Sequence, residues 1–375
     1  KLSMRVYLKQ KMLNNKITFG ELFCGPGGMS QGAKETKVTS LGETYSFDHK
    51  WALDNDRDSC ETYKNNINPD RVIHDDIREF NKKIKKNIEH LQKVDAIGFG
   101  FPCNDFSNLG EKNGLLGKYG PLYKEALKIV DLINPKFFIA ENVTGIKSSD
   151  RGNSFEIIKK DMELKGRYKV YSHLYHFEKY GIPQKRHRYI LVGIREDFKF
   201  NYSPPAPTTP ESHDYISSRS AIENIPSNTF NHDYFQTSFI VEQRLRNIKP
   251  GYNAFNSDLP KEFALNVKGA KLSNIYRRLH PNKPAYTVTG SGGGGTKMYH
   301  WKYPRPLTNR ERARLQTFPD SFEFFGKPES VRKQIGMAVP PKGAKVVFTS
   351  IIKTFINQGY NSIMSNDTQP LELFG

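Results

Sequence analysis

A cysteine and a glutamate are the residues best suited to covalent chemistry, because each follows an apolar segment predicted to be a strand. They are Cys103, in a glycine-rich stretch, and Glu141. The carboxyl ends of parallel strands meet at one rim of an α/β sheet, so we expect the thiol and the carboxylate to lie together there. A thiol nucleophile needs a nearby positive charge that lowers its pKa, which Arg186 and Arg188 could supply. Taken alone, a buried structural cysteine and a solvated basic turn explain the same residues.

A glycine turn follows the first predicted strand and contains Gly25, Gly27 and Gly28. It lacks the Gly-Lys-Ser/Thr ending of a triphosphate-binding loop. The carboxylates of Asp54 and Asp76 could accept hydrogen bonds from ribose hydroxyls or an adenine amino group. An adenosine ligand without a triphosphate fits this set best, although any tight turn favours glycine and surface aspartates are common.

Strands and helices alternate in the first half of the chain, which predicts a parallel α/β sheet. A later pair of strands, joined by a turn, suits a hairpin at the edge of that sheet. The predicted strands are 17–23, 51–53, 94–99, 137–140, 168–175 and 188–194, and a helix is predicted over 123–132.

The proline-rich segment 204–210 is typical of a stiff linker between domains. The division predicted from it is a first domain over 15–200, a second domain over 201–330, and a C-terminal segment, 331–375, that returns to the first domain. Late in the chain, a helix is predicted over 309–318 with Thr308 as its N-cap.

The charge of the chain points to a polyanionic partner. The 375 residues carry a formal net charge of +18, and between residues 241 and 314 fifteen Lys and Arg stand against four Asp and Glu. Nucleic acid is the natural partner, with a merely soluble basic surface as the alternative. The three cysteines lack the spacing of a disulfide framework or a zinc site, so no metal is expected. No segment has the apolar length of a membrane span, and a cytoplasmic protein is expected.

Six segments, in chain order, resemble motifs of the C5-cytosine DNA methyltransferases of bacterial restriction-modification systems, which use S-adenosylmethionine. The resemblance covers nearly the whole chain. The segments are Glu21 to Gly28 (ELFCGPGG), Gly100 to Cys103 (GFPC), Glu141 to Val143 (ENV), Gln184 to Arg188 (QKRHR), Arg305 to Gln316, and Gln334 to Pro341.

This resemblance implies a Rossmann-like, S-adenosylmethionine-dependent methyltransferase sheet with a smaller, irregular target-recognition domain. It implies that the Cys103 thiolate adds to carbon 6 of a flipped cytosine while Glu141 bonds or protonates ring nitrogen 3, so that carbon 5 can take up a methyl group. Arg186 and Arg188 would hold the base and Glu141 in place.

The resemblance also assigns binding residues. The cofactor set is Phe23, Gly25, Gly27, Gly28, Asp54, Asp76, Ile77, Pro102, Met337 and Val339. The DNA set is Gln184, Thr287, Lys297, Tyr299 and Arg305, and His300 and Trp301 are further candidates for groove contacts. Two positions depart from the common pattern: Asn104 stands where most members have Gln, and Met337 stands where most have Asn. Only the backbone of Met337 is therefore assigned to the cofactor.

The expected partners are double-stranded DNA and a cognate restriction endonuclease that acts on the same site, and the expected oligomeric state is a monomer. Two other functions remain open. A tRNA cytosine C5 methyltransferase would share the nucleophile and the acid, and a non-catalytic DNA-binding protein would keep only the fold.

Overall fold

The computed structural model describes residues 13–84, 91–101, 122–148, 153–265 and 273–363. The chain divides into two compact units, and the chain passes between them more than once. Unit 1 combines Lys1–His176, His187–Pro207 and Gly343–Gly375, and unit 2 combines Phe177–Arg186 and Thr208–Lys342. Segments 177–186 and 331–342 thus belong to unit 2, outside the 201–330 range that the proline-rich linker suggests.

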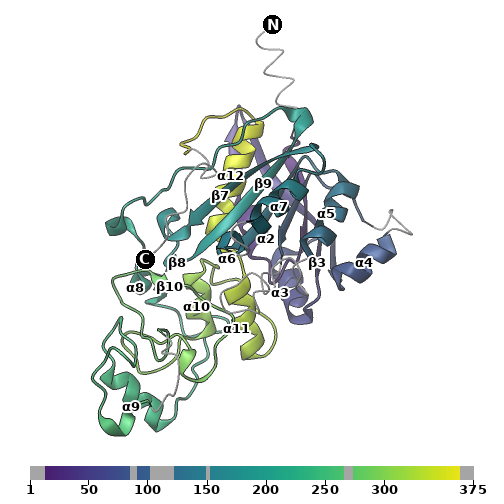
Figure 1. Ribbon diagram of the computed structural model, residues 1–375. Coiled ribbons are helices and arrows are strands. Elements are labelled where there is room, and N and C mark those ends of the chain that lie inside the picture. Colours follow the sequence, from purple (N-terminus) through teal and green to yellow (C-terminus); the bar gives the residue numbers. More distant parts are fainter. Residues whose placement is uncertain (1–12, 85–90, 102–121, 149–152, 266–272, 364–375) are drawn as a thin grey trace. The chain divides into compact units, whose positions relative to one another are not determined.

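Unit 1 is built on one eight-stranded sheet (Figure 1) with the order β2-β3-β1-β5-β6-β9-β7, to which β4 adds by pairing with β3. Its strands are β1 (Lys16–Leu22), β2 (Lys37–Ser40), β3 (Glu43–Asp54), β4 (Arg71–His74), β5 (Ala96–Gly100), β6 (Phe137–Val143), β7 (Tyr168–His176) and β9 (His187–Arg195).

The sheet is mixed, with parallel central strands and an antiparallel hairpin at one edge, as the sequence predicts. Strands β3, β1, β5 and β6 run parallel, whereas β9 runs antiparallel to both β6 and β7. The short segment 177–186 joins β7 to β9, and a short connection joins antiparallel strands because a parallel pair needs a long crossover. The predicted edge hairpin is confirmed, with β7 outermost.

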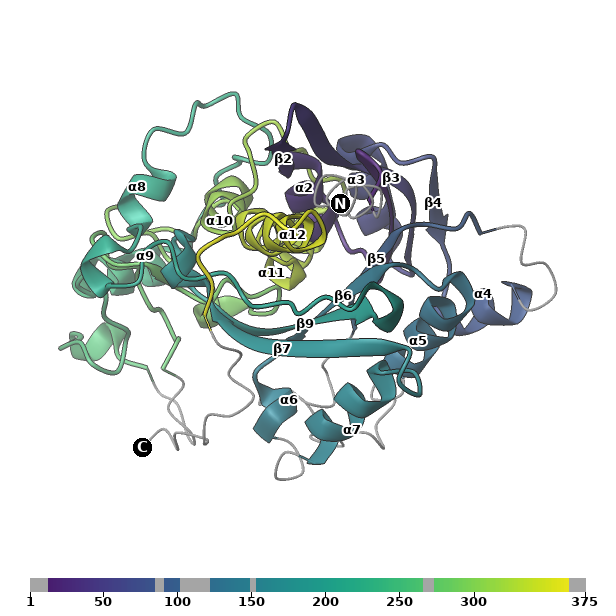
Figure 2. The same cartoon turned by 90° about the horizontal axis from the view of Figure 1, so that it is seen from above.

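Helices cover both faces of this sheet (Figure 2), so the central strands are buried on both sides. This explains why β5 and β6 are continuous apolar runs. On one face Phe348 packs edge-on against Phe19 and Phe47. The helices are α2 (Gly28–Glu35), α3 (Arg57–Ile67), α4 (Ile77–Ile84), α5 (Leu122–Ile133), α6 (Gly145–Ser148), α7 (Asn153–Met162) and α12 (Pro341–Phe355), with the 3-10 turn η5 (Glu196–Phe198).

Unit 2 has short elements and long irregular segments. Its α-helices are α8 (Ser218–Ile222), α9 (Phe239–Asn247), α10 (Asn309–Leu315) and α11 (Pro328–Met337). Two short strands, β8 (Gln184–Lys185) and β10 (Ala285–Tyr286), pair in parallel. The 3-10 turns are η4 (Phe177–Tyr180), η6 (Ser212–Asp214), η7 (Lys261–Phe263) and η8 (Gly294–Thr296).

The predicted start of α10 is confirmed by its cap. The Thr308 hydroxyl accepts a hydrogen bond from the Glu311 N–H, and the Glu311 carboxylate accepts one from the Thr308 N–H. The helix ends at Leu315, three residues before the predicted end.

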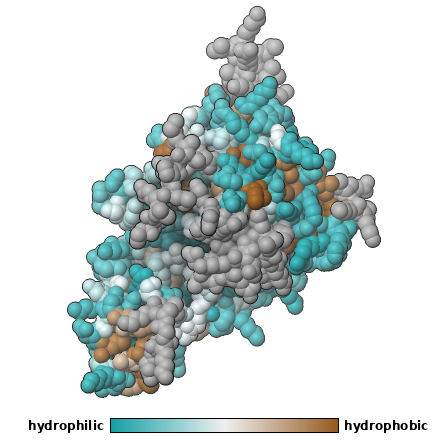
Figure 3. Space-filling view, viewed as in Figure 1, coloured by the Kyte–Doolittle hydropathy of each residue, from teal (hydrophilic) through white to brown (hydrophobic). Residues whose placement is uncertain are grey.

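Hydrophobic residues gather on the surface of the part of unit 2 that holds α9, at the lower left of Figure 3. On α9 itself, Phe239 is 69% and Ile240 51% exposed. None of the described helices has the length and apolar character needed to cross a membrane.

Candidate active site and nucleic-acid interface

The glycine turn between β1 and α2 has an unusual backbone. Phe23, Gly25 and Gly27 have φ angles of 51°, 51° and 96°, in the left-handed region that glycine adopts at little cost. A Cβ at Gly27 would come within 2.9 Å of the Tyr63 ring, so this glycine also permits close packing on α3. At Gly25 the same added atom would meet nothing within 4 Å, so open space lies beside the turn.

Asp54, the last residue of β3, holds this turn. Its Oδ2 accepts a hydrogen bond from the Gly25 N–H at 2.8 Å, and its Oδ1 accepts one from the Asp56 N–H at 2.9 Å. Burial raises the pKa of the Asp54 carboxyl above its ordinary value, and the two N–H donors act in the opposite direction. The side chain predicted to bind ribose therefore already braces the glycine turn.

Asp76 and Ile77 lie at the start of α4, next to the end of β3. The Asp75 N–H donates to the Asp54 carbonyl at 3.0 Å, which brings the two predicted cofactor segments together. The Asp76 carboxylate pairs with the Arg78 guanidinium at 2.6 Å, and that hydrogen bond lowers its pKa. Ile77 is 3% exposed and packs in the core, so only its backbone is open to a ligand.

Glu141 and Arg188 form an ion pair across β6 and β9. Arg188 Nε lies 2.9 Å from Glu141 Oε1, and the two side chains are 13% and 10% exposed. The Nε–H does not point at the oxygen, and Oε1 accepts no hydrogen bond from the described residues. On the neighbouring strand, a Cβ at Gly100 would approach Glu141 Oε2 to 3.4 Å, so glycine leaves the carboxylate room there.

Asn142, which sequence reasoning did not single out, ties β6 to the segment that precedes the predicted nucleophile. Its side-chain Nδ2 donates to the Phe101 carbonyl at 3.1 Å, and its Oδ1 accepts from the Val143 N–H at 2.8 Å. Pro102, Cys103 and Asn104 lie outside the described residues.

Glu21 is a second residue that sequence reasoning left without a role. It is 3% exposed on β1, and its carboxylate accepts a hydrogen bond from the Ser30 hydroxyl. The Ser30 oxygen lies 2.5 Å from the Tyr63 hydroxyl, which completes a buried polar cluster beneath the glycine turn. Burial raises the pKa of Glu21 to about 8. The sequence did contain a signal for this burial, because Glu21 is a charged residue within an apolar run predicted to be a strand.

In unit 2, Gln184, which was assigned to DNA, is buried and bonded to other residues of that unit, and its DNA contact stays a prediction. It is 0% exposed, donates from Nε2 to the Leu315 carbonyl at 3.0 Å, and accepts at Oε1 from the Val288 N–H at 3.0 Å. Gln316 completes this network, with its Oε1 2.5 Å from Gln184 Nε2. Gln184 positions the Val288 segment.

Arg186 has a structural role similar to that of Gln184. It is 1% exposed, and its guanidinium donates to the carbonyls of Val288 and Ala338, both at 3.0 Å. These bonds join the 177–186 segment, the strand β10 region and the end of α11. Arg186 therefore positions backbone within unit 2, whereas Arg188 belongs to unit 1 and carries the contact with Glu141.

Two further residues assigned to DNA, buried Tyr299 and half-buried Arg305, are bonded within unit 2. Tyr299 is 2% exposed and its hydroxyl donates to the Gly294 carbonyl. The Arg305 guanidinium binds both carboxylate oxygens of Glu311, at 2.7 and 2.9 Å, and lies over the ring of Tyr234. The other groove candidates, His300 and Trp301, are 4% and 6% exposed. Aromatic and basic residue types alone therefore do not distinguish a surface that contacts a DNA groove from the core of unit 2.

The remaining assigned residues keep some exposure. Thr287 is half-buried and its hydroxyl donates to the Lys185 carbonyl at 2.6 Å, next to the β8–β10 pair. Lys297 is half-buried. Met337, the last residue of α11, is 61% exposed, and Val339 is 8% exposed.

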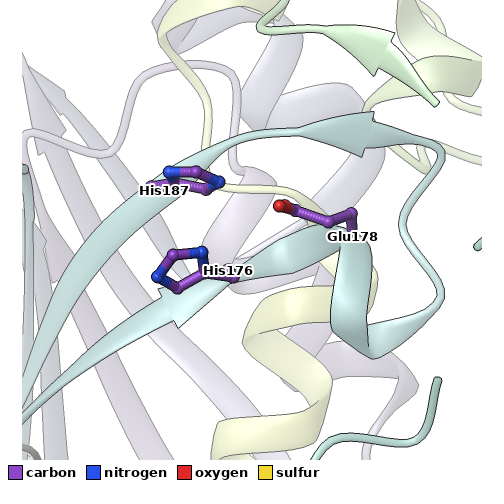
Figure 4. Close-up of side chains that lie close together, drawn as sticks. All are labelled: His176, Glu178 and His187. Atoms are coloured by element: carbon purple, nitrogen blue, oxygen red, sulfur yellow. The ribbon is translucent and has the colours of Figure 1, made fainter. Parts of the chain in front are cut away.

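A histidine pair lies where β7 meets β9. His176 and His187 are direct partners in the strand register, and their ring centroids are 4.1 Å apart. Figure 4 shows the two rings together with Glu178, which follows His176 closely in the chain. These residue types can ligate a metal. Cysteine spacing could not reveal this pair, so the expected absence of a metal stays a prediction.

Comparison with known proteins identifies the family. Residues 17–353 match the sequence model of the C-5 cytosine-specific DNA methylases. The chain is 51% identical to the Type II methyltransferase M.BbvI of Brevibacillus brevis, over 93% of this chain and 94% of that protein. It is 39% identical to the Type II methyltransferase M.NgoFVII of Neisseria gonorrhoeae, over 91% of this chain and 88% of that protein.

Solved structures share the fold. A protein named as a DNA modification methyltransferase encoded within an E. coli prophage superposes with a TM-score of 0.68 at 22% identity, over 90% of this chain and 99% of that one. A Spodoptera frugiperda DNMT2 mutant superposes with a TM-score of 0.58 at 16% identity, over 90% and 99%. The family match spans both units and includes the Glu141–Arg188 pair, so the chain belongs to the C-5 cytosine-specific DNA methylase family.

Proposed function

We propose that the enzyme transfers a methyl group from S-adenosylmethionine to carbon 5 of a flipped cytosine in a specific short sequence of double-stranded DNA, through a covalent adduct with Cys103. The observation that carries this proposal is the Glu141–Arg188 pair, because the carboxylate is held on a rigid strand and keeps one oxygen without a hydrogen bond from the described residues. The family membership of the chain supports the same reaction.

The reaction needs a nucleophile and an acid because carbon 5 of cytosine is a weak nucleophile. In the proposed sequence, the Cys103 thiolate adds to carbon 6 while Glu141 bonds or protonates ring nitrogen 3, and the resulting enamine makes carbon 5 nucleophilic. A proton given to nitrogen 3 returns to Glu141 when the product forms. S-adenosylmethionine, when bound, supplies the methyl group that carbon 5 takes up. A base then removes the proton from carbon 5, and the electron pair left behind expels the Cys103 thiolate.

Glu141 is suited to bind the cytosine base because its Oε1 can still accept hydrogen bonds. A carboxylate oxygen offers two lone pairs, and the exocyclic amino group of cytosine is a donor. Arg188 fixes the carboxylate by charge, while Asn142 holds the Phe101 carbonyl close to the same strand. The segment that leads to Cys103 therefore starts from a fixed point beside Glu141.

The residues of unit 1 fit an adenosine cofactor. Open space beside Gly25 leaves room for a ligand against the backbone of the turn. The Asp54 carboxylate keeps lone pairs for ribose hydroxyls after accepting its two backbone bonds, and Ile77 offers its backbone for the adenine. The proposed cofactor set also contains Phe23, Gly27, Gly28, Asp76, Pro102, Met337 and Val339.

The duplex contacts are proposed for unit 2, which carries most of the basic excess. A base inside a duplex is unreachable, so the enzyme must extrude the cytosine and offset the cost with contacts to the DNA backbone. Thr287, Lys297 and Arg305 are assigned DNA residues that stay partly exposed, although the Arg305 guanidinium is paired with Glu311. Gln184 and Arg186 contribute by holding the backbone next to Thr287.

The test is methyl transfer from labelled S-adenosylmethionine to unmethylated duplex DNA, followed by bisulfite sequencing, with a parallel reaction on tRNA. We expect 5-methylcytosine in one short sequence context. Cys103→Ser should abolish transfer, whereas Cys60→Ser, at a buried cysteine of α3, should retain it. Label in tRNA alone, or binding to DNA without transfer by the folded protein, would contradict the proposal and favour one of the alternative functions.

We propose a cognate restriction endonuclease as the biological partner, because the similar proteins of Brevibacillus and Neisseria are named as Type II methyltransferases. Plasmid DNA modified by the enzyme in cells should resist endonucleases whose site contains the context found by bisulfite sequencing. The proposed active form is a monomer, which sedimentation velocity in the presence of DNA would check.

A further inference from the structure

A small hollow in unit 2 is lined by three cationic side chains. Lys297, Arg312 and Arg332 line it together with Glu329, and Phe235 and Pro306 are among its apolar walls. We call it the Arg312 hollow. Its volume is about 30 Å³, which is room for roughly two groups the size of a water molecule.

Arg312 is the central group, because its charge is buried and forms no ion pair with the described residues. The residue is 3% exposed on α10, and its buried Nε has no hydrogen-bond partner among the described residues. The adjacent carboxylate of Glu311 is already taken by the bidentate bond from Arg305. Burial lowers the pKa of Arg312 to about 10, and the charge of Arg332 acts in the same direction. A buried, unpaired guanidinium costs free energy in the unliganded protein.

The other two cations repeat this pattern. Arg332 projects from α11 and its buried Nε also finds no hydrogen-bond partner among the described residues. Lys297 is half-buried and forms no ion pair with the described chain. Glu329 is exposed and supplies the one carboxylate in the described lining, which leaves the hollow with a net charge of +2. Such a site is prepared for an anion.

We propose that the Arg312 hollow binds a phosphate group of the DNA backbone. The guanidinium fork matches the geometry of a phosphate, and the volume suits the two non-bridging oxygens of a phosphodiester. A DNA phosphate is favoured over the carboxylate of the cofactor, because Lys297, which is assigned to DNA, lines the hollow itself. This inference rests on the proposed function, since it takes duplex DNA as the substrate.

The position of the hollow links it to the proposed DNA contacts. Lys297 follows the glycine run 290–295 and lines the hollow itself. Arg312 and Arg332 come from α10 and α11, which pack together within unit 2. A phosphate bound there would therefore be held by two helices and by the segment that follows the glycine run.

The experiment measures the salt dependence of duplex binding for wild type and Arg312→Met. Neutralising one phosphate contributes about 0.9 to the slope of log affinity against log salt. We expect the slope of the variant to fall by about one and its affinity at 0.1 M salt to fall roughly fivefold to tenfold. The matched control is Arg167→Met, which removes an exposed arginine paired with Asp131 in unit 1 and should leave the slope unchanged.

Melting temperature separates a binding residue from a structural one. Replacing an unpaired buried charge by an apolar side chain of similar length should leave the melting temperature unchanged or raise it. A lower melting temperature with an unchanged salt slope would overturn the proposal. Arg332→Met is the second variant, and it should reduce the slope in the same way even if Arg312→Met does not fold.

Inorganic phosphate tests whether the hollow binds a free anion instead of a phosphate of the DNA backbone. At matched ionic strength, phosphate should raise the melting temperature of wild type more than that of Arg312→Met. If this difference is found but both proteins have the same salt slope with DNA, the hollow takes a free anion and the assignment to the DNA backbone is wrong. Failure of the proposed function is distinguishable, because wild-type protein would then transfer no methyl group to DNA.

Discussion

Arg188 Nε lies 2.9 Å from Glu141 Oε1, across two antiparallel strands at one end of the unit 1 sheet. The ion pair fixes the carboxylate but leaves Oε1 without a hydrogen bond from the described residues. A group that is held in place and still has bonding capacity is suited to act on a substrate, and this arrangement leads to the first prediction.

Arg188→Met should lower the rate of methyl transfer in a single turnover by roughly 100-fold, because Glu141 loses the charge that orients it. Arg188→Lys should recover part of the rate, since it restores the charge without the planar fork. The matched control is Arg195→Met at the other end of β9, where the arginine pairs with exposed Asp197. Equal losses in both methionine variants would show that the effect is not specific to Glu141.

Gly25→Ala should weaken S-adenosylmethionine binding at least tenfold by calorimetry, because the new methyl group enters the open space proposed for the cofactor. The matched control is Gly166→Ala. Gly166 also has a positive φ, 83°, and open space around its Cβ position, so both variants should lose about 1 kcal/mol of stability from backbone strain. Unchanged cofactor binding by Gly25→Ala would place the cofactor elsewhere.

The raised pKa of Glu21 predicts that the stability of the protein depends on pH. Its folded-state pKa is raised from 4.5 to about 8, so the folded state favours the protonated carboxyl. The stabilisation is complete below pH 4.5 and is lost progressively as the pH rises to about 8. Glu21→Gln should therefore unfold at a higher temperature than wild type at pH 8.5, by roughly 3 kcal/mol in stability, with a smaller difference at pH 6. Melting curves across this range would check it, and parallel curves at all pH values would contradict it.

Gln184→Ala should destabilise the protein without a direct effect on DNA contacts. The change leaves the Val288 N–H and the Leu315 carbonyl without their buried partner, a cost of about 2–4 kcal/mol. Gln236→Ala, at an exposed position in the same unit, is the matched control. Thermal melting and the salt slope of DNA binding are the measurements. A reduced slope at an unchanged melting temperature would mean that Gln184 touches DNA.

Local patterns predicted the parts of unit 1 that depend on neighbouring residues in the chain. The apolar runs of β5 and β6 are visible because both faces are buried, and the glycine turn after β1 is visible because its backbone needs glycine. Strand β4 was missed, since four residues with one buried side chain carry little periodicity. The direction of β9 follows from its short connection to β7, and the turn-rich segment between the two strands made this hairpin predictable.

Unit 2 was harder to predict because its contacts are distant in sequence. Gln184 and Arg186 bond to residues more than 100 positions away, so their burial leaves no local signature. Tyr299 and Trp301 were groove candidates by residue type, yet buried aromatic rings also build a core. Arg312 had no visible function in the sequence, and its lack of a partner emerges only in three dimensions.

The bond from Arg186 to the Ala338 carbonyl spans 152 positions and has a consequence for how the protein is made and engineered. At the usual speed of translation, 152 residues take roughly 8–30 s to emerge. During synthesis, segment 177–186 can therefore form its final contacts only after α11 has emerged, whereas the flanking strands β7 and β9 can pair earlier. For the same reason, exchanging recognition units between relatives requires the transfer of 177–186 together with 208–342, because a graft of the later stretch alone would leave its backbone partners behind.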